Sequence, residues 1–215
     1  MSKKDNEVVV GISDHDLFEE PGVRFAGFLP HGGIVEHLIA QCAKKMRFTP
    51  RGLCETDLSF KQIIPYCMIT RGDEIFSYRR LGKSGEKRLV GKTSIGIGGH
   101  MNPIESKGFE TLMKENMLRE LGEEVNIKSP GKGGLMSYEI VGMIHTTDDP
   151  VSSVHVAVVY QIFLPPEAEV NVRETETLVG EWKTAEALYE DPDNLELWTK
   201  ICLEEHFAKM KPDEV

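Results

Sequence analysis

The chain is poor in the features that mark secreted, membrane and zinc-ribbon proteins. Its 215 residues include four cysteines, with no CxxC pair and no spacing typical of metal ligands: Cys42, Cys54, Cys67 and Cys202. We therefore expect reduced thiols in a cytoplasmic protein. The longest apolar run, 154–164, is too short and too polar to span a membrane, and residues 1–16 lack the pattern of a signal peptide.

An excess of basic residues is also absent. The chain has 25 Lys and Arg against 35 Asp and Glu, a net charge of −10. Stable nucleic-acid binding depends on many Lys and Arg contacts to phosphates, so we do not expect a nucleic-acid partner. Apolar residues make up 40% of the chain, which is ordinary for a globular protein, and we expect a small-molecule partner.

Three carboxylates cluster in the segment Arg119-Glu120-Leu121-Gly122-Glu123-Glu124. At about 100° per residue, Glu120, Glu123 and Glu124 fall within roughly 100° on one face of a helix. Like charges at this spacing repel, whereas hard oxygen ligands are favourable around a divalent cation such as Mg²⁺. Taken alone, such a cluster is more typical of a solvated helix face than of a metal site, so its context decides.

The context is an apolar run, 93–97, followed by Gly98-Gly99 and then the acidic helix. This arrangement resembles the box of the Nudix (MutT-like) hydrolase family, G-x5-E-x7-R-E-U-x-E-E-x-G-U, in which U is a bulky aliphatic residue. Seven of its nine fixed positions are present: Gly99, Arg119, Glu120, Leu121, Glu123, Glu124 and Ile127.

The departures from the box are specific. Gly99 and Arg119 are 20 residues apart where the motif needs 14, so six residues are inserted in the loop. Thr111 stands where the motif has its first glutamate, with Glu110 beside it and Glu115 one turn before Arg119, and Asn126 replaces the final glycine.

The resemblance extends to most of the chain. Segments 25–28, 59–66 and 96–103, with the pair Arg79-Arg80, are similar to a bacterial-type subgroup of predicted phosphoesterases with an N-terminal extension. The resemblance implies an α/β protein: a Nudix-type α/β/α sandwich with a mixed β-sheet. It also implies an N-terminal extension at 1–58 packed on a Nudix domain at 59–215, and it allows a homodimer.

For function, the resemblance implies hydrolysis of a pyrophosphate bond, typically in a nucleoside diphosphate linked to another group, with Mg²⁺ or Mn²⁺ as cofactor. Glu120, Glu123 and Glu124 match the metal-binding glutamates, and the Gly99 carbonyl is a further expected ligand. Arg119 is expected to orient the glutamates through charge-assisted hydrogen bonds, or to form a surface ion pair with Glu115.

The base that activates water is not fixed by the motif. Glu174 and Glu176, in the polar loop 171–177, are candidates because such a loop can reach the metal, and Glu120 is another. For the substrate phosphates, a basic cluster predicts contacts, with Arg79 and Arg80 favoured over its other members, Lys83, Lys87, Arg88 and Lys92.

Two histidines and two rival functions stay open at this point. His155, in an apolar strand, is either a satisfied core residue or, as the subgroup resemblance implies, a substrate contact. His100 follows the glycine pair and is expected either to face the metal pocket or to be only a turn residue.

The rivals to a hydrolase are a Nudix-fold sensor that binds a nucleotide-like ligand without cleaving it, and an enzyme of the isopentenyl-diphosphate isomerase type.

The hydrophobic patterns predict alternating strands and helices. We expect helices at 33–45, 109–125 and from Asp193 to about Lys209, with Asn126 as a left-handed cap after the second. We expect strands at 8–12, 61–70, 74–80, 89–97, 136–145, 154–164 and 178–182.

Overall fold

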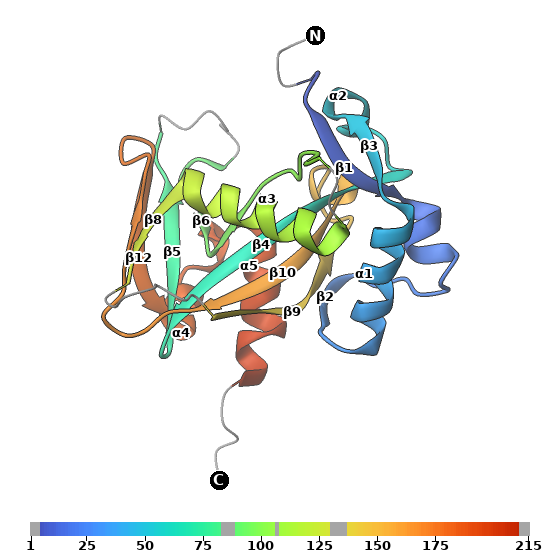
Figure 1. The fold of residues 1–215 in the computed structure, drawn as a ribbon. Helices are drawn as coiled ribbons and strands as arrows, with labels where there is room; N and C mark the ends of the chain where they lie inside the picture. The colour runs from blue at the N-terminus through green and yellow to red at the C-terminus, as the bar shows by residue number, and fades with distance from the viewer. Residues whose placement is uncertain (1–4, 83–88, 106–107, 130–136, 211–215) are drawn as a thin grey trace. The chain divides into compact units, whose positions relative to one another are not determined.

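Strand β4, Phe60–Arg71, lies at the centre of a large mixed sheet in the computed structural model, which describes residues 5–82, 89–105, 108–129 and 137–210 (Figure 1). Within these residues the sheet has ten strands, and its main path follows the order β12-β5-β4-β10-β9-β2. Eleven of the twelve residues of β4 are buried, as expected of a strand covered on both faces. The prediction of an α/β protein with a mixed sheet is confirmed.

The chain forms two compact units. The first comprises Met1–Tyr66, Gly98–Arg119 and Ile140–Val159, and the second comprises Cys67–Ile97, Glu120–Glu139 and Tyr160–Val215. Because β4, β9, β10 and helix α3 contribute residues to both, the predicted boundary at 58/59 is not where the units divide the chain. The division into an extension and a Nudix domain therefore stays a prediction.

In the first unit, β1 pairs antiparallel with β3 and with the beginning of β4, so the N-terminal segment adds strands to the sheet. Helix α1 buries Val35, Leu38 and Cys42, the three- and four-residue spacing that places side chains on one helix face. The elements of this segment are β1 Val8–Ser13, a π-helix His15–Glu19, β2 Gly27–Pro30, α1 Gly33–Lys45, β3 Arg47–Pro50 and α2 Arg51–Cys54.

Two glycines of the sheet are required by its geometry. Gly72, in the turn between β4 and β5, has a φ of +56°, a backbone conformation that residues with a Cβ rarely adopt. Gly98, at the end of β7, lies so close to β4 that a Cβ would be 2.7 Å from the Pro65 carbonyl oxygen. The Gly98 position therefore fixes where the chain leaves the sheet before the acidic helix.

In the second unit, β12 pairs antiparallel with the whole of β5, from Leu178 opposite Arg80 to Thr184 opposite Glu74. Strands β8 and β11 form a separate two-stranded sheet. The elements are β5 Glu74–Arg80, β6 Thr93–Ser94, β8 Val125–Lys128, β11 Glu169–Val172, β12 Leu178–Thr184, α4 Ala185–Tyr189 and α5 Leu197–Glu205. The remaining strands and the acidic helix are β7 Gly96–Gly98, α3 Phe109–Glu124, β9 Ser137–His145 and β10 His155–Phe163.

Three local predictions are wrong. Asn126 is not a left-handed cap: the chain passes from α3 directly into β8, where Asn126 pairs with Asn171 of β11. The last helix begins at Leu197, because the Glu196 side chain accepts a hydrogen bond from Arg80 and its N–H bonds to Thr93. The predicted strand 89–97 is extended only from Thr93, since Gly91 has a φ of +82° in a turn.

The other predicted elements agree with the structure to within a few residues. Met136, expected to start β9, and the basic residues Lys83, Lys87 and Arg88 lie outside the described residues. The four cysteines are free and buried. Among the helices that the structure describes, none has the length and apolar character needed to cross a membrane.

We expect Lys61 to be a major stabilising residue of the first unit. Its buried ammonium donates to the carbonyl oxygens of Leu58 (2.7 Å) and Ser153 (2.8 Å) and lies 3.2 Å from an Asp14 carboxylate oxygen. Lys61→Met removes all three donors and leaves buried acceptors unsatisfied, so urea unfolding should show a loss of about 2 to 4 kcal/mol.

Lys128→Met is the matched control for Lys61→Met. Lys128 is exposed and lies 3.9 Å from Glu169, so its replacement should change stability by less than about 0.5 kcal/mol. Equal effects of the two substitutions would refute the structural role of Lys61.

Candidate active site

Helix α3 carries the acidic residues of the predicted site in its last two turns. Of the three glutamates, Glu120 is buried with 9% of its surface exposed, Glu123 is exposed and Glu124 is half-buried. Burial and the charge of Glu120 raise the pKa of the Cys67 thiol, so Cys67 is protonated and unsuited to act as a nucleophile. A cysteine-dependent isomerase therefore finds no support at this position.

The C-terminal end of α3 concentrates negative charge. Burial raises the pKa of Glu124, and the neighbouring carboxylates of Glu174 and Glu123 raise it further. The guanidinium of Arg80 opposes this effect, but Arg80 also donates to Glu196 at 3.0 Å. Burial and the two neighbouring carboxylates together outweigh the effect of Arg80, so the pKa of Glu124 stays raised.

This donor set fits a divalent cation in chemistry. Carboxylate oxygens are the hard ligands that Mg²⁺ and Mn²⁺ prefer, and a cation among them would relieve their mutual repulsion. In the part of the chain that the structure describes, no three His, Cys, Asp or Glu side chains are already gathered as a metal site. Ionised carboxylates at neighbouring helix positions repel one another, so we expect them to converge only around a cation.

The polar loop 171–177 is held against the end of α3. The backbone N–H of Arg173 donates to the Glu124 carbonyl at 2.9 Å, and the Arg173 side chain donates to the Val125 carbonyl at 3.2 Å. Glu174 influences the titration of Glu124 and accepts from the Thr177 hydroxyl at 2.9 Å. Glu176 is exposed. Of the two candidate bases in this loop, both exposed, Glu174 is the one whose charge raises the pKa of Glu124.

Arg79 and Arg80 lie on opposite faces of β5, because successive side chains of a strand alternate. Arg80 interacts with Glu124 and Glu196. Arg79 lines a polar cleft of about 310 Å³, together with Gly91, Thr93, Glu181, Lys183, Ala187, Leu188, Asp191, Asn194 and Leu195. The two side chains therefore have different surroundings, and contact of Arg79 and Arg80 with substrate phosphates stays a prediction.

In the first unit, Arg119 is tied to the loop that follows Gly98-Gly99. Its guanidinium donates to the His100 carbonyl at 2.8 Å and to the Asn116 side-chain oxygen at 3.2 Å. Asn116 is fully buried. Asn116 was not predicted as a site residue, although a single amide among the apolar residues of the helix indicates a buried side chain with hydrogen-bond partners.

Half-buried His100 and buried His155 form a pair with 3.2 Å between their Nε2 atoms. His155 Nδ1 lies 2.6 Å from the Val151 carbonyl oxygen, which requires a proton on Nδ1. The His155 Nε2 then accepts, and His100 donates from its Nε2. Burial lowers the pKa of both rings, to about 3 for His100, so the pair is neutral at physiological pH. His155 is thus hydrogen-bonded in the core at 6% exposure, and its predicted contact with substrate stays a prediction.

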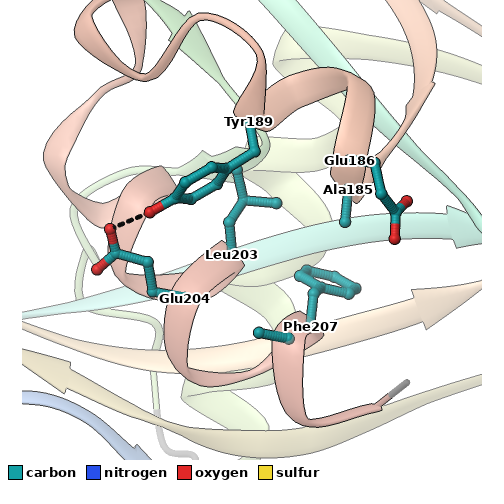
Figure 2. A pocket seen from close by; sticks show the side chains of 7 residues that line it. Ala185, Glu186, Tyr189, Leu203, Glu204 and Phe207 are labelled. Carbon is teal, nitrogen blue, oxygen red and sulfur yellow. Dashed lines mark hydrogen bonds between the residues drawn. The ribbon is translucent and has the colours of Figure 1, made fainter. Parts of the chain in front are cut away.

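A second cleft in the second unit is mainly apolar (Figure 2). It has a volume of about 450 Å³ and is lined by Ala185, Glu186, Tyr189, Leu203, Glu204, Phe207 and Ala208. The Tyr189 hydroxyl donates to Glu204 at 2.5 Å across its edge. It contains none of the predicted site residues and no cationic side chain, so it is not suited to bind phosphates.

No protein-family model matches the chain. Protein YmaB of Bacillus subtilis (strain 168) is 36% identical over 207 residues, which cover 95% of this chain and 98% of YmaB. The crystal structure of the Nudix-type protein Tm1382 superposes with a TM-score of 0.73 at 24% identity, covering 92% of this chain and 97% of Tm1382.

A more distant structural match is a bifunctional NMN adenylyltransferase/ADP ribose pyrophosphatase from Francisella tularensis. It has a TM-score of 0.49 and 13% identity, and the match covers 69% of this chain and 42% of that protein.

We expect Glu124→Gln to stabilise the metal-free protein at neutral pH. The raised pKa of Glu124 means that its ionised form opposes folding above that pKa, and the cost disappears as the pH falls through it. The melting temperature should rise by roughly 1 to 3 °C at pH 7 and remain unchanged at roughly pH 4.

The control for this measurement is Glu110→Gln, an exposed residue in the first turn of the same helix. A carboxylate there interacts favourably with the helix N-terminus, so its loss should give no gain. A lower melting temperature for Glu124→Gln at pH 7 would contradict the account of charge crowding at this end of α3.

Proposed function

The chain belongs to the family of Bacillus subtilis protein YmaB and has the Nudix hydrolase fold, and from that premise we propose that it is a divalent-metal-dependent pyrophosphohydrolase. The fold agrees with the resemblance that residues 98–127 predict and supports a function of the pyrophosphohydrolase type. The substrate we propose is a nucleoside diphosphate linked to another group, or a related phosphorylated metabolite.

The observation that carries the proposal is the crowding of carboxylates at the end of α3. Glu124 is half-buried next to Glu123 and Glu174, and its pKa is raised. A divalent cation among these carboxylates would offset their mutual repulsion, so the arrangement supports a cation-dependent site.

Glu120, Glu123 and Glu124 would hold Mg²⁺ or Mn²⁺. When bound, the cation would polarise phosphate oxygens and lower the pKa of a water molecule. The Gly99 carbonyl, assigned from the resemblance alone, stays a predicted further ligand.

The protein's own residues have distinct proposed roles. A carboxylate of the loop 171–177 takes the proton from the attacking water, and Arg80 contacts a phosphate oxygen of the substrate. Arg119 maintains the geometry of the helix end from its hydrogen bonds to His100 and Asn116. His155, as a neutral hydrogen-bonding group, contributes to substrate binding. Lack of a nucleic-acid partner, formation of a homodimer and a cytoplasmic location stay predictions.

Glu123→Gln tests the proposal directly. Phosphate and pyrophosphate release would be screened over nucleotide sugars, dinucleoside polyphosphates, NAD-type dinucleotides and (d)NTPs, with Mg²⁺ and with Mn²⁺. We expect metal-dependent turnover by the wild type, reduced at least about a hundredfold in Glu123→Gln because a charged ligand becomes a neutral amide.

Glu110→Gln, on the same helix but outside the acidic cluster, should retain wild-type turnover. If no compound is cleaved while one of them binds without metal, to wild type and Glu123→Gln alike, the protein is a Nudix-fold sensor and the catalytic proposal is wrong.

The general base can be identified by comparing Glu174→Gln with Glu176→Gln. Both residues are exposed, but the charge of Glu174 raises the pKa of Glu124, so we expect Glu174→Gln to lower kcat by about 10²- to 10⁴-fold and to abolish the acidic limb of the pH–rate profile. Glu176→Gln should change kcat less than about threefold. The reverse order of effects would assign the base to Glu176. If both substitutions lowered kcat equally, neither residue would be the single base in this loop.

A further inference from the structure

The loop between Gly99 and helix α3 differs from the family motif in two ways. Six residues are inserted, and Thr111 occupies the position of the first glutamate. Thr111 is exposed, so it does not fill a buried role. The question is which residues of the first unit hold the motif arginine, Arg119, in place.

Asn116 connects Arg119 to the inserted loop. Its side-chain oxygen accepts from the Asn102 backbone N–H at 2.8 Å and from Arg119 at 3.2 Å. Its amide nitrogen donates to the carbonyl oxygens of Asn102 at 3.0 Å and Leu112 at 2.9 Å. A side-chain amide has two acceptor sites and two donors, and all four are used with no exposed surface. Neither Asp nor Leu can reproduce this pattern.

Asn102 continues the connection to the N-terminal segment. Its side chain donates to a Glu7 carboxylate oxygen at 2.9 Å and to the Val8 carbonyl at 3.1 Å. The adjacent Met101 carbonyl accepts from the Val10 N–H of strand β1 at 2.9 Å. The start of the inserted loop is therefore bound to β1 through backbone and side-chain hydrogen bonds.

Glu7 is itself held by a second charged group. Its other carboxylate oxygen accepts from Arg51 of helix α2 at 3.2 Å, and Arg51 also donates to Glu55 at 2.7 Å. Burial alone raises the pKa of Glu7, but hydrogen bonds from Asn102 and Arg51 outweigh it and keep the pKa below its usual value. Glu7 is therefore a fixed anion and a strong acceptor for Asn102.

We propose that Glu7, Asn102 and Asn116 are positioning residues for hydrolysis, forming a hydrogen-bonded chain through which the N-terminal segment sets the geometry of Arg119 and of the His100 carbonyl. This inference rests on the proposed function. It assigns a role to three otherwise unexplained features: the inserted loop, the absent glutamate and the N-terminal extension, which becomes a component of the catalytic scaffold.

The test uses the full-length protein and a substrate identified in the release screen, with kcat, KM and the Mg²⁺ concentration for half-maximal rate measured at 25 °C. Glu7→Ala and Asn102→Ala should each lower kcat by about tenfold with KM changed less than about threefold. Glu7→Gln, which keeps an acceptor for Asn102, should restore most of the rate. The double variant should be no slower than either single variant, because both remove the same connection.

Leu38→Ala controls for loss of stability. Leu38 is buried in α1 of the same unit, and its truncation should lower the melting temperature without lowering kcat below the transition. The proposal is overturned if Glu7→Ala and Asn102→Ala retain the wild-type kcat, or if their kcat falls only as much as that of a Leu38→Ala protein with the same melting temperature.

Hydrogen exchange provides a readout that needs no turnover. The Asn102 N–H is bonded to Asn116, so Asn116→Ala should accelerate its exchange at least about tenfold, whereas Leu38→Ala should not. If the wild type cleaves no compound, the proposed function fails and the catalytic role fails with it. Unchanged exchange at Asn102 would, independently of activity, show that the chain of hydrogen bonds does not hold the loop.

Discussion

The constraint on which the rest of the structure depends is the burial of strand β4 on both faces. A strand in this position must pair its backbone groups with neighbours, and each polar side chain that it buries costs free energy unless it finds a hydrogen-bond partner. β1, β5, β7 and β10 supply its partners. Lys61, at its beginning, is tolerated because two carbonyl oxygens and a carboxylate surround its ammonium. The approach of β7 to β4 in turn leaves no room for a side chain at Gly98, and this determines where the loop toward α3 begins.

The elements that sequence patterns predicted well are those whose stability is local or periodic. Helix α1 was predicted at its observed bounds because its apolar residues recur at helical spacing. The wrong predictions involve residues whose partners are distant in sequence. Asn126 joins a strand because Asn171 lies opposite, and the last helix begins only at Leu197 because Arg80 and Thr93 bind Glu196. No local propensity contains that information.

The candidate site divides in the same way. The glutamates of α3 were found from their spacing, since a motif within one helix is local. The pairing of His100 with His155 and the connection from Asn116 through Asn102 to Glu7 were not found, because they join residues 14 to 95 positions apart in the sequence. Adjacent Arg79 and Arg80 were grouped by sequence proximity, but the alternation of side chains along β5 separates them. Adjacency in a strand is evidence for opposite faces.

The buried cysteines have a consequence for how opening of the molecule can be observed. Cys42 and Cys54 belong to the first compact unit, and Cys67 and Cys202 belong to the second. Burial raises the pKa of all four thiols, to about 12 for Cys42 and about 11 for Cys54, so alkylating reagents react only when a thiol becomes exposed and ionises. Each unit thus carries two natural chemical probes, and their separate rates of alkylation report how often each part of the protein opens.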